Sequence, residues 1–198
     1  MFRPFGWWVR RRVWLAVGLL LLAACGAPHS FSGTELTPRE PAPAITLTDQ
    51  QGQTFSLSAQ RGKVVLIYFG YTACPDICPA TLGTFQAVRR QLGDAADDVR
   101  FVFVTVDPQH DTPDVLRAYL DGIDPAIVGL TGSPAAIAQV TRAYGVYAAA
   151  HPDATDGHSV EHTDRIFVVD RAGDWRLLYG FDVAPSKLVD DLRALLAE

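Results

Sequence analysis

The stretch KVVLIYFGYTACPDICP, residues 63–79, joins a β-prone run directly to two cysteines four residues apart. Val64–Phe69 is continuously apolar and rich in β-branched and aromatic side chains, which is typical of a strand buried on both faces. The turn signal at residues 61–63 precedes it. The stretch therefore predicts a central strand that passes into a helix, with Cys74 and Cys78 at the junction.

The elements predicted in the rest of the chain support this interpretation. Strands are predicted at Phe101–Val106, Ile166–Val169 and, after a turn at residues 171–174, Trp175–Tyr179. Helices, each with a proline in its first turn, are predicted at about Pro79–Leu92, Pro113–Leu120, Pro134–Tyr144 and Pro185–Leu196. The alternation predicts an α/β domain with a mixed sheet between helices. Residues 146–164 lack periodicity and are predicted to form a loop.

The first 24 residues differ from the rest. Arginines at positions 3, 10, 11 and 12 precede the apolar run Val13–Ala24, which is shorter than the roughly 20 residues of a bilayer span. The run ends in small residues before Cys25, as in a bacterial lipoprotein signal. The sequence predicts a signal peptide over residues 1–24 and lipid attachment at Cys25. An uncleaved membrane anchor is the alternative, and both place the chain at a membrane, on the extracytoplasmic (periplasmic or outer) face.

The remaining chain divides into a tether and a domain. Residues 25–43 contain four prolines and no apolar period, so they are predicted to be a tether. Residues 44–198 are long enough to bury a core as one domain. Without the signal segment, 13 basic residues stand against 22 acidic ones. This acidic balance argues against nucleic acid as a partner, because such binding uses basic patches.

The cysteine pair permits three interpretations. If Cys74 and Cys78 share a helical turn, their sulfurs lie on one face. A helix N-terminus favours thiolates, so the pair could bind a soft metal ion or form a disulfide. It could also be two buried structural cysteines.

Three motifs resemble those of the Sco/SenC family of thioredoxin-like copper proteins. They are the stretch from Gly62 to Pro79, VTVDPQHDTP at residues 104–113 and VEHT at residues 160–163. The likeness runs from about Ile45 to the C-terminus. Glu161 stands where relatives commonly have Asp, which keeps the charge.

The resemblance implies a thioredoxin-like fold with an added β-hairpin. It also implies that copper, as Cu(I) or Cu(II), binds to Cys74, Cys78 and His162. Family members help to assemble the CuA centre of cytochrome c oxidase, as copper donors or as thiol reductants of its cysteines. The implied partner is therefore the copper-bearing oxidase subunit or another copper acceptor.

The chemistry of the residues agrees with copper, because two thiolates and an imidazole suit Cu(I). Zinc is the competitor, since Cys-x3-Cys and His158-x3-His162 have the ligand spacing of zinc sites. His151 and His158 could also capture copper transiently. His110 is predicted to be an exposed turn residue. Asp111 or Thr112 is predicted to cap the helix that begins at Pro113, in preference to acid–base work by Asp107 and Asp111.

The cysteine pair is compatible with two classes of function. A metallochaperone would bind and release copper, whereas an oxidoreductase would use Cys74 and Cys78 in thiol–disulfide exchange. The usual redox motif has two residues between the cysteines, and here there are three. Thioredoxin-type enzymes also keep a proline before the strand that faces the dithiol, where this chain has residues 162–165 without one. The sequence favours the metallochaperone, with a redox or copper sensor as a third option.

Overall fold

The computed structural model of the chain describes residues 29–150 and 160–198, with the side chains of residues 149–150 and 160–162 also outside the described part. The chain separates into two units, residues 1–30 and 31–198. The predicted signal peptide, Cys25, His151 and His158 therefore lie outside the described residues. None of the described helices is both long and apolar enough to cross a bilayer.

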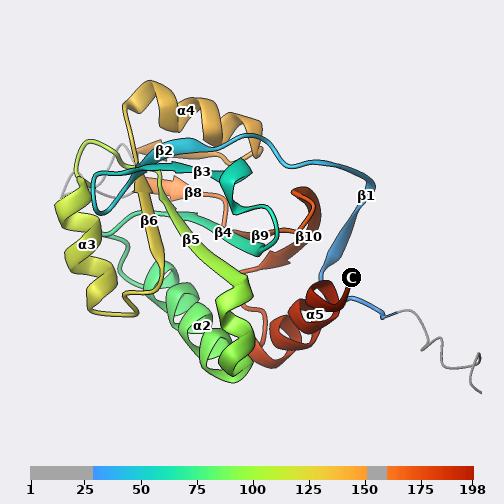
Figure 1. The fold of residues 1–198 in the computed structure, drawn as a ribbon. Coiled ribbons are helices and arrows are strands. Elements are labelled where there is room, and N and C mark those ends of the chain that lie inside the picture. The colour runs from blue at the N-terminus through green and yellow to red at the C-terminus, as the bar shows by residue number, and fades with distance from the viewer. Residues whose placement is uncertain (1–28, 151–159) are drawn as a thin grey trace, which may run out of the picture. The chain divides into compact units, whose positions relative to one another are not determined.

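The second unit is built on one mixed sheet of eight strands, in the order β1-β10-β9-β4-β5-β6-β2-β3 (Figure 1). The strands are β1 (Thr34–Pro41), β2 (Thr46–Asp49), β3 (Thr54–Ser56), β4 (Val64–Gly70), β5 (Val99–Thr105), β6 (Val128–Thr131), β9 (Arg165–Val169) and β10 (Asp174–Gly180). Strands β4, β5 and β6 are parallel, and the others pair antiparallel to their neighbours.

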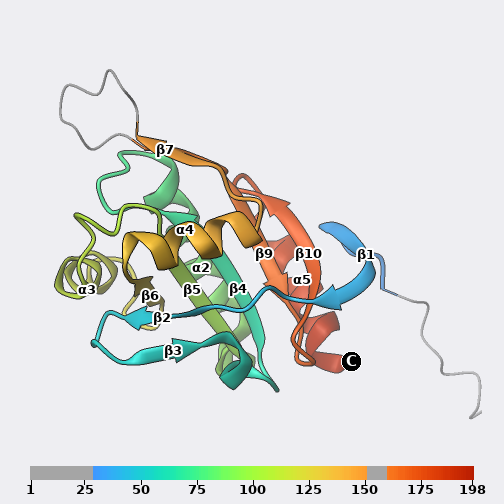
Figure 2. The same cartoon turned by 90° about the horizontal axis from the view of Figure 1, so that it is seen from above.

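Helices cover both faces of this sheet (Figure 2). They are α2 (Ile77–Leu92), α3 (Pro113–Asp121), α4 (Pro134–Ala143) and α5 (Pro185–Ala197), with short 3-10 helices at Leu57–Gln60 and Gly93–Asp98. The four helices and the four strands predicted from sequence are thus confirmed, with ends that differ by a few residues. Proline within the first turn of each helix fits, because the N–H that proline lacks has no partner there.

Strand β4 is fully buried and separates two hydrophobic cores. Its alternate residues Val64, Leu66 and Tyr68 pack with α2, α3 and α5, whereas Val65, Ile67 and Phe69 pack with α4. The period of two in a strand sends successive side chains to opposite faces. A continuously apolar strand is therefore what a sheet covered on both sides requires, as predicted.

The predicted tether is wrong over its second part. Residues 34–41 form strand β1, which pairs with β10 at the edge of the sheet. Ahead of it, Ser32 donates from its N–H and hydroxyl to the buried carboxylate of Asp191 at 2.8 and 2.6 Å. The Tyr179 hydroxyl donates to the same carboxylate at 2.6 Å. The chain is thus fixed to the domain from about residue 31, and not from residue 44.

The predicted loop over residues 146–164 contains a two-stranded ladder. Strands β7 (Ala148–Ala150) and β8 (Val160–His162) pair antiparallel, with Ala148 opposite His162. The N–H of Thr163 donates to the carbonyl of Tyr147 at 3.1 Å and continues the pairing below them. The hairpin base is thus regular backbone, whereas residues 151–159 lie outside the described part of the chain.

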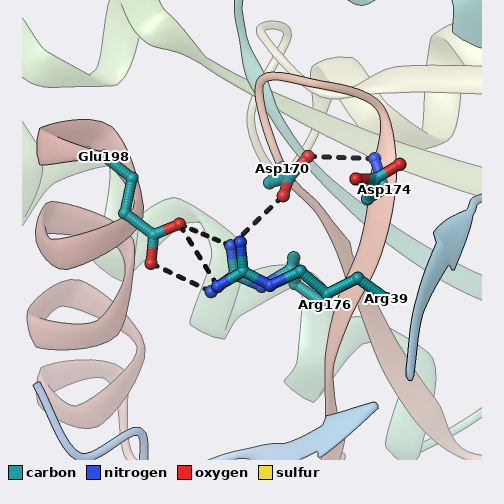
Figure 3. Close-up of polar contacts among 5 residues, drawn as sticks. All are labelled: Arg39, Asp170, Asp174, Arg176 and Glu198. Atoms are coloured by element: carbon teal, nitrogen blue, oxygen red, sulfur yellow. Dashed lines mark hydrogen bonds and ion pairs between the residues drawn. The ribbon is translucent and has the colours of Figure 1, made fainter. Parts of the chain in front are cut away.

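Helix α5 is held at its end by a buried arginine on β10. The Arg176 guanidinium, 2% exposed, donates to both carboxylate oxygens of Glu198 at 2.6 and 2.9 Å (Figure 3). It also donates to Asp170 at 3.2 Å, and lies 5.5 Å from the centre of the Phe31 ring. This cluster joins residue 198, the β9–β10 turn and the start of the second unit at Phe31, at the opposite end of the sheet from the cysteines.

Candidate metal site

The two cysteines lie where β4 passes into α2, but only Cys78 belongs to the helix. The two cysteines therefore do not share a helical turn, which was the condition for placing both sulfurs on one helix face. Cys74 precedes Pro75, and the ring of a proline disfavours helical backbone in the residue before it. The sulfurs still converge, because the Cys78 N–H donates to the Cys74 Sγ at 3.4 Å. Asp76 at the N-cap makes no side-chain hydrogen bond to the helix, so the Cys74 sulfur accepts an N–H of the first turn instead.

Cys78 is fully buried, and the backbone of β4 leaves room for its sulfur. A Cβ at Gly70 would lie 2.6 Å from the Cys78 Sγ and 2.7 Å from the Phe103 ring. Burial raises the pKa of the Cys78 thiol well above its usual range, partly opposed by a hydrogen bond with the Tyr71 backbone. Cys74 is partly exposed. The two thiols are not joined in a disulfide, so the pair consists of one accessible and one enclosed sulfur.

A tyrosine hydroxyl connects the buried thiol to the segment after β8. Tyr68, in the middle of β4, places its hydroxyl 3.7 Å from the Cys78 Sγ and 3.4 Å from Asp164 Oδ1. Burial, followed by the charge of Cys78, raises the pKa of this hydroxyl, so it remains a donor. Asp164 is two residues beyond His162. The fold therefore brings the chain around His162 to the dithiol, although Cys78 and His162 are far apart in the sequence.

The side chain of His162 lies outside the described part of the chain. No three His, Cys, Asp or Glu side chains within the described part form a cluster that could hold a metal ion. Two ligands of the predicted set, Cys74 and Cys78, are thus placed together, and the third is placed by its backbone alone. Its assignment stays a prediction.

Asp111 has a different role from the predicted helix cap. Thr112 is the N-cap of α3 and accepts from the Val115 N–H. The Asp111 carboxylate is instead 1% exposed and accepts from the Thr72 N–H at 3.0 Å and the Thr72 hydroxyl at 2.5 Å. The Thr105 hydroxyl donates to it at 2.5 Å. Asp111 therefore fastens the loop before Cys74 to the end of β5.

The remaining predicted residues near this edge have structural roles. His110 is exposed and its Nδ1 lies 2.6 Å from Asp107 Oδ2, as expected for a turn residue. Asp107 thus pairs within its own turn. The role of Tyr68 in the site was not predicted from the sequence. The one sequence signal for this role is that Tyr68 carries a hydroxyl within a run that is otherwise apolar or glycine. The Thr72–Asp111 contact was also not predicted, because its partners are 39 residues apart.

The fold and the site define a thioredoxin-like protein with a Cys-x3-Cys dithiol at the first strand–helix junction of its central sheet. The sequence profile of the SCO1/SenC family matches residues 36–197. The chain therefore belongs to the SCO1/SenC family. An SCO2-like protein of Rickettsia conorii is 36% identical over 149 residues, which cover 74% of this chain and 73% of the relative.

Solved structures agree with this assignment. The copper-bound ScoI of Bradyrhizobium japonicum is 38% identical and matches with a TM-score of 0.74, covering 79% of this chain and all of the other. The apo Sco1 protein of Thermus thermophilus is also 38% identical, with a TM-score of 0.77 and 86% and 100% of the two chains covered. The predicted family and the thioredoxin-like fold are thus confirmed. Copper, the metal predicted from sequence, is the metal bound in the first of these relatives.

Proposed function

We propose that this protein is a metallochaperone that binds one copper ion through Cys74, Cys78 and His162 and releases it to an acceptor. The single observation that carries the proposal is the Tyr68 hydroxyl, which lies within reach of both Cys78 and Asp164. This contact supports a site in which the hairpin base supplies the third ligand to a dithiol on the opposite segment.

The donor set suits the proposed ion. Two thiolates and an imidazole are soft and borderline ligands, which favour Cu(I) and also accept Cu(II). The dithiol of the described structure is protonated at Cys78, whose pKa is raised by burial. Copper binding therefore displaces thiol protons to solvent, and affinity rises with pH. Cys74 is partly exposed, whereas Cys78 is buried, so Cys74 is suited to be the first sulfur that an incoming ion meets and the last that a departing ion leaves.

Copper binding by the copper-bound ScoI relative supports copper over zinc for this chain. Closed structural zinc sites have four protein ligands, whereas open zinc sites also use three, so the Cys2His donor set by itself accommodates either ion. His158, the proposed fourth zinc ligand, lies outside the described residues. A metal-competition experiment separates the two ions, because a Cys2His site binds Cu(I) with higher affinity than Zn²⁺.

Thiol–disulfide exchange is the second candidate function. The Cys78 N–H donates to the Cys74 Sγ, which holds the partly exposed sulfur next to the buried one. Cys74 would attack a partner disulfide, and Cys78 would then displace the partner and close the disulfide. The proline that redox enzymes keep before the facing strand is absent from residues 162–165. This observation favours copper binding, with exchange as a linked activity.

The decisive experiment is a Cu(I) competition titration of the reduced chain, with the His162→Ala and His158→Ala variants. We expect one high-affinity site, a large loss for His162→Ala, and little change for His158→Ala. Loss of even an outer-shell partner of a metal ligand costs roughly 10–100-fold in affinity, and loss of a direct ligand should cost at least as much. Tight copper binding by the Cys74–Cys78 disulfide form would contradict the proposal. Wild-type affinity in His162→Ala would also contradict it.

We also propose the CuA site of cytochrome c oxidase as the destination, and lipid attachment at Cys25 as the means of membrane localisation outside the cytoplasm. The first can be tested by oxidase activity in cells at low copper. There, His162→Ala should fail to support assembly although it still cycles its thiols.

Lipid attachment at Cys25 can be tested by metabolic labelling with a fatty acid. Cys25→Ser should abolish the label and leave copper binding unchanged.

A further inference from the structure

The hydroxyl of Tyr119 is a buried polar group without a hydrogen-bond partner among the described residues. Tyr119 lies in the last turn and a half of α3, next to the buried Leu120. A buried hydroxyl without a partner is destabilising, by roughly 1–3 kcal/mol. Such groups are rare in folded proteins and each needs an explanation. The tyrosine is therefore either a defect of the core or a donor whose acceptor is present in another state.

The ring of Tyr119 is packed beside the dithiol. Its centre lies 6.0 Å from that of Phe103, on β5. The edge of the Phe103 ring and the Cys78 Sγ both lie within 3 Å of the position that a Cβ on Gly70 would take. Tyr119 and Cys74 are both partly buried side chains packed against the core that contains Cys78. The Phe103 ring also lies 6.2 Å from the ring of Tyr68, so it connects Tyr119 and Tyr68 within the core that contains Cys78.

Electrostatics connect the Tyr119 hydroxyl to both sulfurs. Burial raises its pKa, and negative charge on Cys78, Cys74 or Asp111 raises it further, with the effect falling in that order. The hydroxyl therefore stays protonated and feels the charge of the two sulfurs when they are thiolates. Neutral thiols are weak acceptors, whereas thiolates accept hydrogen bonds more strongly.

We propose that Tyr119 is a positioning residue for copper, whose hydroxyl donates a hydrogen bond to the thiolate pair that forms when copper displaces the thiol protons. The inference rests on the proposed function. In the metal-free dithiol the hydroxyl has no described partner, and in the copper form it gains one. The cost of burying the hydroxyl is thereby removed on binding, which raises copper affinity. Tyr68 already contacts Cys78 and Asp164, so Tyr119 would supply a second hydroxyl to the same pair of sulfurs.

The test is Tyr119→Phe, which keeps the ring and removes only the hydroxyl. For the reduced full chain, kept in detergent, we expect Cu(I) affinity to fall by on the order of tenfold in a competition titration. The thermal midpoint of the metal-free protein should stay the same or rise, because no described hydrogen bond is lost. In the Cu(II) form the thiolate-to-copper charge-transfer band should move to lower energy, since a donor to sulfur has been removed.

Tyr144→Phe is the matched control. Tyr144 is also a buried tyrosine, but it packs in the other core and its hydroxyl donates to the Pro43 carbonyl at 3.0 Å. This variant should lower the thermal midpoint and leave copper affinity and the charge-transfer band unchanged. The two substitutions therefore have opposite effects on folding and on binding.

The outcomes distinguish the inference from the function on which it rests. If the wild-type chain does not bind copper tightly, the proposed function is wrong. If the wild-type chain binds and Tyr119→Phe binds equally well with an unshifted band, the inference is wrong. A fall in copper affinity accompanied by an equally large fall in the free energy of unfolding of the metal-free protein would assign Tyr119 to the core alone. That result would also overturn the inference.

Discussion

The carboxylate of Asp111 accepts hydrogen bonds from both the N–H and the hydroxyl of Thr72, 39 residues earlier in the chain. Thr72 stands two residues before Cys74, in a turn that is not part of any strand or helix. Asp111 is itself fixed to β5 through the Thr105 hydroxyl. The position of the exposed thiol therefore depends on a buried carboxylate from the β5–α3 connection.

Replacement of Asp111 should damage both the fold and the site. Asp111→Ala leaves one N–H and two hydroxyls without their acceptor, and we expect a loss of roughly 2–4 kcal/mol in the free energy of unfolding. Asp111→Asn keeps one acceptor oxygen and should lose about half as much. Urea unfolding measures both. Asp114→Asn is the control, because that exposed acid pairs with Arg117 on the surface and should change stability by less than about 0.5 kcal/mol.

A side chain at Gly70 should displace the buried thiol. The added methyl of Gly70→Ala would lie 2.6 Å from the Cys78 Sγ, so either the sulfur or the Phe103 ring must move. We expect a loss of about 1–3 kcal/mol from overpacking and weaker copper binding in the same titration. Gly83→Ala, in the middle of α2 with open space at its Cβ, should instead stabilise the protein by about 0.5–1 kcal/mol. Equal effects at the two glycines would show that the close approach at Gly70 is unimportant.

The two cysteines should differ in reactivity in the reduced, metal-free protein. Cys78 is fully buried and its pKa is raised, so little of it is thiolate near pH 8, and the thiolate is the nucleophile. Cys74 is partly exposed. Iodoacetamide should label Cys74 first, and labelling of Cys78 should speed up as the pH rises toward its pKa. Mass spectrometry of a time course measures this, with Cys74→Ser and Cys78→Ser to identify each site. Faster labelling of Cys78 at neutral pH would contradict the burial that the structure shows.

The sequence predicted the core elements because their signals are local. Strand β4 is a run of apolar residues, and each helix has a proline within its first turn. The parts that were missed depend on contacts between distant residues. Strand β1 carries two prolines and is almost entirely exposed, so nothing within it indicates a strand. Its stability comes from pairing with β10, and proline is tolerated there because β1 is an edge strand.

The site shows the same division. The cysteine spacing is visible in the sequence, whereas the acceptor role of Asp111 depends on its partner Thr72 in another segment. The helix-capping interpretation was reasonable for Asp111 because capping is local, and Thr112 does cap α3. Tyr68 was predicted only as a strand residue. Its hydroxyl became a link between Cys78 and Asp164 because β4 and β9 are neighbours in the sheet.

The contact between Arg176 and Glu198 predicts a pH-dependent contribution to stability. The Arg176 guanidinium, held by two hydrogen bonds (Figure 3), lowers the pKa of Glu198 below its usual range. A carboxyl with a lowered pKa in the folded state stabilises above its unfolded pKa of about 4.3, and this stabilisation is lost as the pH falls through the lower folded value. Glu198 is 43% exposed, so solvent screening limits the effect to roughly 1 kcal/mol.

Glu198→Gln should therefore be less stable than wild type by about this amount from pH 5.5 to 7.5 in urea unfolding, and the difference should shrink below about pH 4.3. Arg39→Gln is the control, because Arg39 is exposed and lies 3.8 Å from Glu198. It should cost at most a few tenths of a kcal/mol, and a difference for Glu198→Gln that persisted unchanged at pH 3 would mean that its charge is not the cause.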